Sequence, residues 1–231
     1  MADARHSAGG ARQLNKKAYE SLREAIVQCE LAPGSWVTAS ELASRLELGG
    51  TPTMRAMTLL ESEGFTRPVK RKGWQIAPIT KESAKAVFGA YRIVAPGILD
   101  LLLQNATEPE LDEYVKRTYA WSRGYGEFQA DFSVHPISYA LKICGNEFVA
   151  TMAAGVVAHL ERMMVFSFRQ GSFAEGPAAF ARDAVTEAIA VRDKVRAHLA
   201  LEDLIRHSEL EVFKGLSRPL GSRLARIAPA M

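Results

Sequence analysis

The side chains able to carry chemistry in this 231-residue chain are scattered and complete no familiar catalytic motif. There is no phosphate-binding P-loop, no glycine fingerprint for a dinucleotide, no serine nucleophile elbow and no HExxH zinc motif. Helical proteins that hold two metals use Glu-x-x-His pairs, and the sequence has none. We therefore predict a binding protein and not an enzyme.

One acid and one histidine do have the spacing of metal ligands. Asp131 and His135 are four residues apart, so a helix would place both on one face, where they could bind a divalent metal such as zinc or nickel. The alternative is that both are ordinary polar residues. Pro136 follows His135 directly and would kink or begin the helix that has to align the pair.

Positive charge near the N-terminus indicates phosphate binding. The net charge is only +3, but residues 1–80 carry 11 Lys and Arg against 8 Asp and Glu, whereas residues 81–231 carry 18 of each. Lys70, Arg71 and Lys72 form a basic run between two short apolar segments. Such a run either holds phosphates without choosing a base sequence or is a solvated turn.

The elements that position these residues begin with two predicted helices. Apolar residues recur at helical spacing from 14 to 29, and Pro33-Gly34 ends that segment. Thr38 and Glu41 match a capping box, which predicts the start of a short second helix. This helix should end before Gly49-Gly50.

A third helix and a hairpin complete a predicted N-terminal domain. Thr51 is predicted to be the N-cap, with Pro52 in the first turn. Gly64 should end the helix, and segments 65–69 and 74–77 should flank the basic run as a β-hairpin. The expected buried stripe of the third helix is Thr53, Ala56, Met57 and Leu60.

Beyond a short linker at 78–80, helical periodicity dominates. The expected helices span about 81–105, 108–125, 128–144, 146–170, 177–198 and 200–216, which together predict an antiparallel all-helical bundle. The fold class is therefore mainly α: a winged helix-turn-helix followed by a helical bundle. The expected organisation is a disordered tail at 1–12, the winged domain at 13–78, the helical domain at 79–217 and a frayed tail at 218–231.

Composition favours a cytoplasmic globular protein. Hydrophobic residues make up 48% and charged residues 24%. The sequence has no long uninterrupted apolar run and its start lacks the apolar core of a secretory signal, so we expect neither a membrane span nor export. Cys29 and Cys144 have no motif spacing, which suits two buried thiols in a reducing compartment.

Several short motifs follow one another in a recognisable order. They are an L-R-x-x-I helix at 22–26, a P-G-S turn at 33–35, an E-L-A helix at 41–43, the T-P start at 51–52 and a G-x-x-I-A-P wing at 73–78. Residues 14–78 resemble the winged helix of the GntR family of bacterial transcription regulators. Residues 81–210 resemble, more loosely, the FCD effector domain of its FadR-like branch.

The resemblance implies a ligand-responsive regulator that binds a palindromic double-stranded DNA operator as a homodimer. The helix opening at Thr51 would enter the major groove N-terminus first, with its free amides and dipole favouring a phosphate, and the wing tip would lie at the minor groove. The implied DNA-binding residues are Ser40, Gly49, Gly50, Thr51, Pro52, Thr53, Arg55, Arg71, Lys72 and Gly73.

The sequence departs from the family pattern at the recognition helix. Gly49-Gly50 stand where the family usually has Ser-Arg, and Met54 stands where it usually has arginine. Arginine commonly reads guanine, with about 1–3 kcal/mol of discrimination for each base. Arg55 lies one residue later, about 100° around the helix. This pattern is compatible with three alternatives. The protein has an unusual operator, it binds DNA weakly, or it is a dimeric sensor or scaffold without sequence-specific DNA binding.

The resemblance also implies an effector site inside the helical domain. Metal-binding FCD domains use an Asp and three His, for which Asp131, His135 and, in place of the last ligand, His207 are the candidates. Arginines near the missing histidines suit a small carboxylate or phosphate instead. Alternatively, they are surface residues whose stems pack on the bundle. The implied effector-binding residues are Arg92, Asp131, His135, Arg162, Arg182 and His207.

Overall fold

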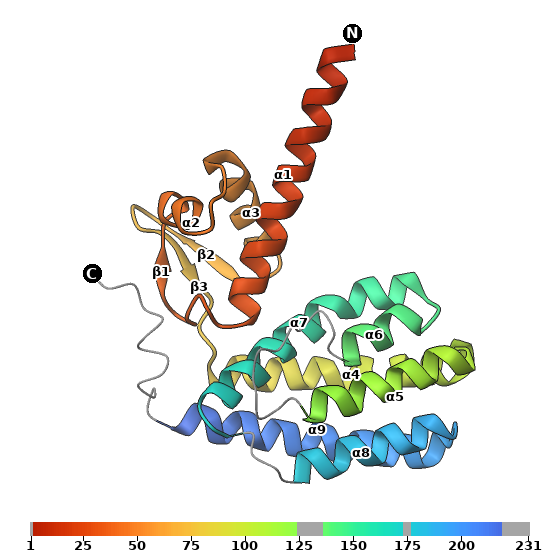
Figure 1. Cartoon of the computed structure of the whole chain (residues 1–231). Coiled ribbons are helices and arrows are strands. Elements are labelled where there is room, and N and C mark those ends of the chain that lie inside the picture. The colour runs from red at the N-terminus through yellow and green to blue at the C-terminus, as the bar shows by residue number, and fades with distance from the viewer. Residues whose placement is uncertain (1, 124–135, 173–176, 219–231) are drawn as a thin grey trace. The chain divides into compact units, whose positions relative to one another are not determined.

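The chain consists of two units that meet in sequence between Ile79 and Thr80. The computed structural model in Figure 1 describes residues 2–123, 136–172 and 177–218.

The N-terminal unit combines three helices with a three-stranded antiparallel sheet. β3 lies between β1 and β2, with Trp36 opposite Gln75 and Thr66 opposite Ile76. The predicted winged helix-turn-helix is confirmed, although β1 was not predicted because two residues are too few to show an alternating pattern. The elements are α1 (Ala2–Val27), β1 (Trp36–Val37), α2 (Ala39–Arg45), α3 (Gly50–Ser62), β2 (Thr66–Val69) and β3 (Gly73–Ile76).

The core of this unit forms where α1 packs against α3 and the sheet closes beneath them. The predicted stripe of α3 is confirmed, since all four of its members are buried. Each large apolar side chain removed from water contributes about 1.5–3 kcal/mol to the free energy of unfolding. The fully buried side chains are Leu22 and Ile26 in α1, Met57 and Leu60 in α3, and Phe65 and Ile76 around the sheet.

A polar contact ties α1 to the end of α3. The Tyr19 hydroxyl donates to Glu63 Oε1 at 2.5 Å, and Arg23 Nε lies 3.6 Å from Glu63 Oε2. The Arg23 guanidinium also lies 5.8 Å from the centre of the Phe65 ring. Partial burial, together with the hydrogen bond and negative charge of Glu63, raises the pKa of Tyr19 to about 12. These contacts therefore hold α1 against the C-terminal end of α3, outside the apolar stripe.

Both ends of the helix-turn-helix segment are capped as expected. Thr38 Oγ1 accepts from the Glu41 amide at 3.2 Å, and the Glu41 carboxylate accepts from the Thr38 amide at 2.8 Å. At the end of α3, Gly64 has a φ of +80° and the Phe65 amide donates to the Leu60 carbonyl at 2.8 Å. The predicted capping box and glycine stop are confirmed.

Two expectations about helix starts differ from the structure. Residues 2–12 continue α1 as helix and do not form a disordered tail, which is consistent with the alanine-rich sequence there. The N-cap of α3 is Gly49 and not Thr51. The amide and hydroxyl of Thr53 both donate to the Gly49 carbonyl, at 3.0 and 2.9 Å, and close the first turn two residues earlier than expected.

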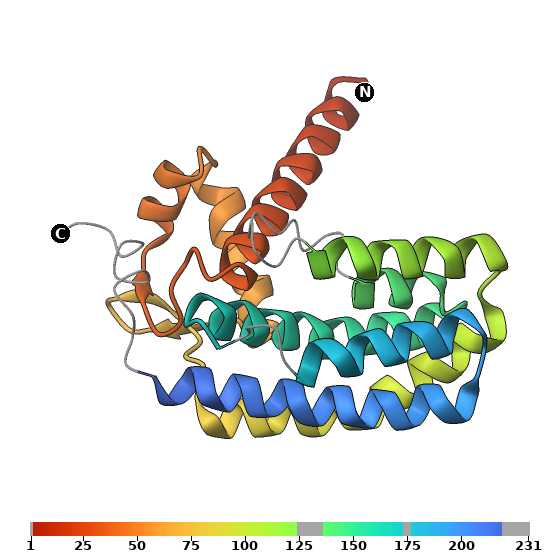
Figure 2. The ribbon, with the colours of Figure 1, turned by 60° about the horizontal axis from the view of Figure 1, so that its bottom comes forward.

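The second unit is a bundle of long helices (Figures 1 and 2). α4 packs against α7 and α9, while α8 packs against α9 and α5. The predicted mainly α fold is confirmed. The helices are α4 (Lys81–Asn105), α5 (Glu108–Arg123), α6 (Pro136–Ile143), α7 (Glu147–Arg169), α8 (Pro177–Ala190) and α9 (Lys194–Ser217).

The corner between α8 and α9 lies several residues before the expected break near residue 199. Arg192 has a φ of +53°, and Asp193 is the N-cap of α9, accepting from the Arg196 amide at 3.0 Å. The Arg192 guanidinium donates to the carbonyls of Leu103, at 2.5 Å, and Ala106, at 2.6 Å. This arginine therefore satisfies carbonyl groups at the C-terminal end of α4, which have no partner within the helix.

Two of the described helices, α4 and α7, are long and apolar enough to cross a membrane by length and composition alone. Core helices of helical proteins pass the same test. In α4, Phe88, Leu99 and Leu102 are buried in the bundle, yet only 33% of its most apolar window is buried. Part of its hydropathy therefore belongs to an exposed face, described below.

The wing requires glycine at residue 73. A Cβ there would lie 2.4 Å from the Val37 carbonyl oxygen, and φ is +87°. We expect Gly73→Ala to lower the free energy of unfolding of the N-terminal unit by at least about 2 kcal/mol, from left-handed strain and overpacking. Urea denaturation followed by the fluorescence of Trp36 and Trp74 measures this.

Gly50→Ala is the matched control, because a Cβ at Gly50 meets nothing within 4 Å. Its unfolding free energy should stay within about 0.5 kcal/mol of the parent value. Equal midpoints for the two variants would contradict the structural role given to Gly73.

Candidate nucleic-acid interface and helical-domain interior

The outer face of α3 is the first candidate surface. Because Thr53, Ala56, Met57 and Leu60 face the core, the opposite side of the helix is left to solvent. Met54 is 48% exposed and Leu59 is 52% exposed. Thr51, Arg55 and Thr58 are also exposed on α3.

The N-terminal end of α3 is open. Gly49 and Gly50 are exposed, and a Cβ at Gly50 would meet nothing within 4 Å, so another backbone could approach closely. The first amides of a helix have no acceptor within it and favour an anion such as phosphate. Pro52, half-buried, has no amide to offer. This end therefore suits a phosphate contact through Gly50 and Thr51.

Thr53 was predicted to contact DNA, and the structure corrects this. Its side chain is 0% exposed, and its hydroxyl is bonded to the Gly49 carbonyl. It builds the first turn of α3 and has no surface to offer a ligand. Its neighbour Met54, which was not among the predicted contacts, occupies the exposed side instead.

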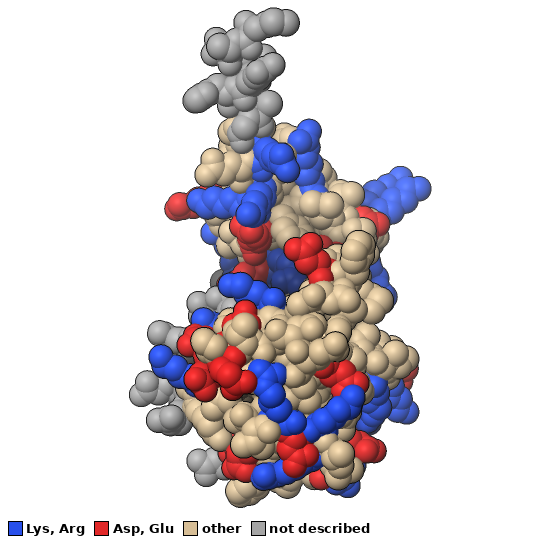
Figure 3. All heavy atoms as spheres, turned by 90° about the vertical axis from the view of Figure 1, so that its right-hand side faces the viewer, with Lys and Arg blue, Asp and Glu red and all other residues tan. Residues whose placement is uncertain are grey.

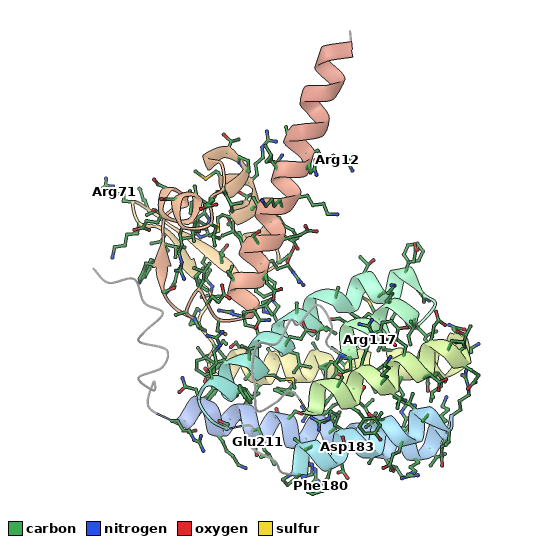
Figure 4. The ribbon with its side chains drawn as sticks, viewed as in Figure 1. Arg12, Arg71, Arg117, Phe180, Asp183 and Glu211 are labelled. Carbon is green, nitrogen blue, oxygen red and sulfur yellow. The ribbon has the colours of Figure 1, made fainter. Side chains whose placement is uncertain are left out.

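The basic run forms the tip of the wing. The Lys72 amide donates to the Val69 carbonyl at 3.0 Å, and Arg71 sits in the turn with a φ of +66°. Arg71 projects from the tip in Figure 4. Lys70 and Arg71 are exposed and make no ion pair with any described residue. A non-glycine residue held at positive φ marks a strained site, which is often functional.

Three further residues that were predicted to contact DNA differ in their surroundings. The Lys72 ammonium lies 5.3 Å from the centre of the exposed Trp36 ring, which positions it beside β1. Gly73 is half-buried against the backbone of Val37 and Thr38, so it shapes the wing and is not itself a contact surface. Ser40 is exposed in the first turn of α2.

Basic residues of α1 were missed by the sequence analysis. Arg12, Lys16 and Lys17 are exposed, and Figure 3 shows Lys and Arg gathered on this side of the N-terminal unit. Arg12 extends from α1 in Figure 4. Treating residues 1–12 as a tail concealed the continuous helix that brings Arg12 and Lys16 onto one face, four residues apart.

The interior of the helical unit is polar on α7. Arg162 is 2% exposed and Glu161 is 5% exposed. Ser138 on α6 donates to Glu161 Oε1 at 2.8 Å. A buried charge needs a partner or hydrogen bonds to remain ionised, so this cluster is held by specific polar contacts and not by packing alone.

Buried hydroxyls lie near this cluster and at the end of α7. Tyr91 and Tyr114 are both buried, and burial raises the pKa of both, to about 12 for Tyr114. Tyr114 and Glu161 raise the pKa of Tyr91 further, which places these groups within electrostatic reach of one another. The hydroxyls of Ser167 and Ser172 are buried without a hydrogen-bond partner among the residues described.

The predicted effector arginines have different surroundings. Arg182 on α8 is 15% exposed, lies on the face that also buries Val185 and Ile189, and has its Nε 3.5 Å from Asp183 Oδ1. Arg92, by contrast, is 45% exposed and bonds Glu209 on α9 at 2.5 Å. Arg162 and Arg182 are therefore inward-facing, and the expectation that Arg92 faces the interior is wrong.

The predicted metal ligands are not brought together by the part of the structure described. Asp131 and His135 lie outside the described residues. His207 is half-buried, with Nδ1 2.8 Å from the Asp203 carbonyl of its own helix. Among the described residues, no group of three His, Cys, Asp or Glu could hold a metal ion.

An ion cluster between α4 and α9 also escaped the sequence analysis. Asp100 accepts from His198 Nε2 at 2.7 Å and from Lys194 Nζ at 3.0 Å. The hydrogen bond from His198, followed by that from Lys194, lowers the pKa of Asp100 below its usual value. Arg92, earlier in α4, bonds Glu209, later in α9. The two helices therefore run antiparallel and are joined by ion pairs at two positions along their length.

Comparisons with known proteins bear on both units. Residues 14–76 match the family described as bacterial regulatory proteins, gntR family. An uncharacterized HTH-type transcriptional regulator from an unstable DNA locus of Streptomyces ambofaciens is 26% identical over 193 residues, or 78% of this chain and 80% of that protein. The uncharacterized HTH-type transcriptional regulator YdhC of Bacillus subtilis is 30% identical over 96 residues, 40% of this chain and 42% of that protein.

Solved structures share the fold at low sequence identity. E. coli McbR/YncC superposes with a TM-score of 0.73 at 13% identity, over 87% of this chain and 97% of that one. A structure described as a GntR transcriptional regulator of Rhodococcus sp. RHA1 gives 0.68 at 15% identity, over 87% and 97%. With the family match, the order of helices and the basic wing, residues 14–76 of this chain form a winged helix-turn-helix domain of the gntR family of bacterial regulatory proteins.

Proposed function

We propose that this chain is a transcription regulator that binds a palindromic DNA operator as a homodimer and responds to a small acidic metabolite. The observation that carries the proposal is that one gntR-family domain presents both an open, exposed α3 N-terminus and a basic wing tip. α3 enters the major groove with Gly50 and Thr51 leading, and Arg71 and Lys72 hold phosphates or the minor groove at the wing.

Selection of binding sites from random duplexes by the full chain tests this proposal. We expect a two-fold related sequence to emerge, and affinity for it to fall steeply as salt rises because phosphate contacts release counterions. The runner-up function is a dimeric sensor or scaffold, suggested by Gly49, Gly50 and Met54 in place of the usual polar readers. Selection that yields no preferred sequence would favour it.

The exposed face of α4 supports dimerisation. Ile93 is 80% exposed, and a Cβ on Gly89 or Gly97, one helical turn to either side, would meet nothing within 4 Å. A protruding side chain flanked by two gaps is complementary to a copy of itself. Around a two-fold axis near Ile93, each Ile93 fits the gap at the partner's Gly89 or the partner's Gly97.

The same face of α4 carries charge at both of its ends. Lys81 and Lys85 are exposed near its beginning, whereas Asp100 near its end is already paired with Lys194 and His198 of α9. The proposed pairing therefore rests on the shape around Ile93 and not on charge. Such an isologous interface would cover the part of α4 that the bundle leaves exposed.

The polar interior supports an anionic effector. Arg162 and Arg182 face inward from α7 and α8, two helices that both pack on α9. A small carboxylate or phosphate would supply acceptors. By repacking the helices it would change operator affinity, typically by about 1–3 kcal/mol.

Substitution of Arg71 at the wing tip should raise stability and lower DNA affinity. Arg71→Gly removes left-handed strain of roughly 1–2 kcal/mol but adds unfolded-state freedom, so we expect a net stabilisation of about 0.5–1 kcal/mol. DNA affinity should fall at the same time, because one phosphate contact is lost. Urea denaturation and fluorescence anisotropy on the selected duplex measure the two effects.

Lys70→Ala is the control, because it also removes one charge from the tip but relieves no positive φ. It should weaken binding without raising the unfolding midpoint. If Arg71→Gly binds DNA as tightly as the wild type at several salt concentrations, the wing tip is not part of the DNA interface.

The dimer should depend on Ile93. Ile93→Glu places an unpaired charge at the centre of the two-fold contact and should convert dimer to monomer in sedimentation velocity. Phe180→Glu is the matched control, since Phe180 on α8 is 77% exposed and lies outside this face. A dimeric Ile93→Glu variant would show that another surface joins the protomers.

The effector site should depend on Arg182. A panel of small carboxylic acids and inorganic phosphate, tested by thermal unfolding, should contain a compound that raises the melting temperature of the wild type. Arg182→Gln should abolish that rise, whereas Arg206→Gln should keep it, because Arg206 is exposed and paired with Asp203. Equal responses of both variants would exclude Arg182 from the site.

A further inference from the structure

The outer face of α3 carries an exposed methionine, Met54, where a DNA-binding helix meets the bases. We propose that Met54 recognises thymine through its 5-methyl group, so that the operator has T·A pairs beneath the N-terminal half of α3. The inference rests on the proposed DNA-binding function and specifies the base that this helix selects.

The position of Met54 is fixed by its neighbours. Thr53 before it and Ala56 after it are 0% and 1% exposed, which sets the rotation of α3 and leaves Met54 at 48%. Thr51 lies three residues before Met54 and Thr58 four residues after it, so the three form one strip along the helix.

The centre of the strip offers DNA almost no hydrogen bonding. Met54 has only a polarizable thioether and methyl group. The Thr58 hydroxyl donates to the Met54 carbonyl at 3.2 Å, so its hydrogen is used within the helix. The Thr51 hydroxyl, three residues before Met54, is the polar group at the other end of the strip. At Met54 itself, the strip therefore presents only a methyl group, methylene groups and one sulfur.

Among the bases, only thymine shows a methyl group in the major groove. A methionine set against guanine or cytosine would bury their polar edges without partners, which costs free energy. Set against thymine it buries one methyl group, which is worth about fourfold in affinity. Met54 thus selects thymine both by attraction and by exclusion of the alternatives.

The surroundings of Met54 allow close approach. Gly49 and Gly50 have no side chains at the N-terminal end, and Gly50 borders open space. Arg55, exposed and about 100° around the helix from Met54, is the charged donor available next to the strip, for a guanine or a phosphate. Leu59 lies five residues beyond Met54, about 140° around the helix, and does not belong to the strip.

The experiment begins with sites selected from random duplexes by the full chain. Each selected thymine is then replaced by deoxyuridine, which lacks only the 5-methyl group, and binding is measured by fluorescence anisotropy. We expect at least one position in each half-site at which uracil weakens binding about fourfold. Met54→Ala should bind the thymine and uracil duplexes equally at that position, and Met54→Arg should select guanine there.

Leu59→Ala is the matched control. It removes an apolar side chain of similar exposure from the same helix, and it should keep the preference for thymine over uracil. A wild type indifferent to uracil at every position, or a Met54→Ala variant that keeps the preference, overturns the assignment while leaving operator binding intact. Failure to select any sequence overturns the proposed function as well, so the two failures are distinguishable.

Discussion

The packing of α3 on α1 is the constraint on which the candidate interface depends. Met57 and Leu60 of α3 and Leu22 and Ile26 of α1 are all fully buried where the two helices pack, and this burial fixes the rotation of α3 for every other residue that it carries. Thr53 and Met54 are adjacent in sequence, yet one is fully enclosed and the other is half in solvent. The core therefore determines which side chains α3 can present to a duplex. The hydrogen bond between Tyr19 and Glu63 fixes the same orientation at the C-terminal end of α3.

The helical unit has an apolar core, but two groups of residues depart from the usual distribution of polarity. Arg162 and Glu161 are enclosed, whereas Ile93, Phe148 and Met152 are largely exposed, Phe148 to 89%. A bundle that only had to fold would bury the apolar set and leave the ions in water. The proposed effector inside the bundle and the proposed second protomer outside it would account for both exceptions, and each would link the stability of this unit to a binding event.

Sequence alone predicted the elements whose signals are local. The capping box at Thr38, the stripe of α3 and the glycine stop at Gly64 arise from spacing within a few residues, and all are present. Features that depend on distant contacts were not predictable. The enclosure of Arg162, the exposure of Arg92 and the strand at Trp36 depend on partners tens of residues away. The start of α3 lies two residues before the predicted one because the amide and the hydroxyl of Thr53 both donate to the Gly49 carbonyl.

The corner at Arg192 has a bearing on how the helical unit assembles. One guanidinium joins the α8–α9 turn to Leu103 and Ala106 at the end of α4 and to Glu108 at the start of α5, segments more than eighty residues earlier in the chain. Contacts between such distant segments require a long stretch of chain to be closed into a loop first, which costs entropy before any contact is gained. The carbonyl groups at the end of α4 therefore gain these hydrogen bonds only after the segment that contains Arg192 has folded back onto them. We expect this end of the bundle to form late in folding.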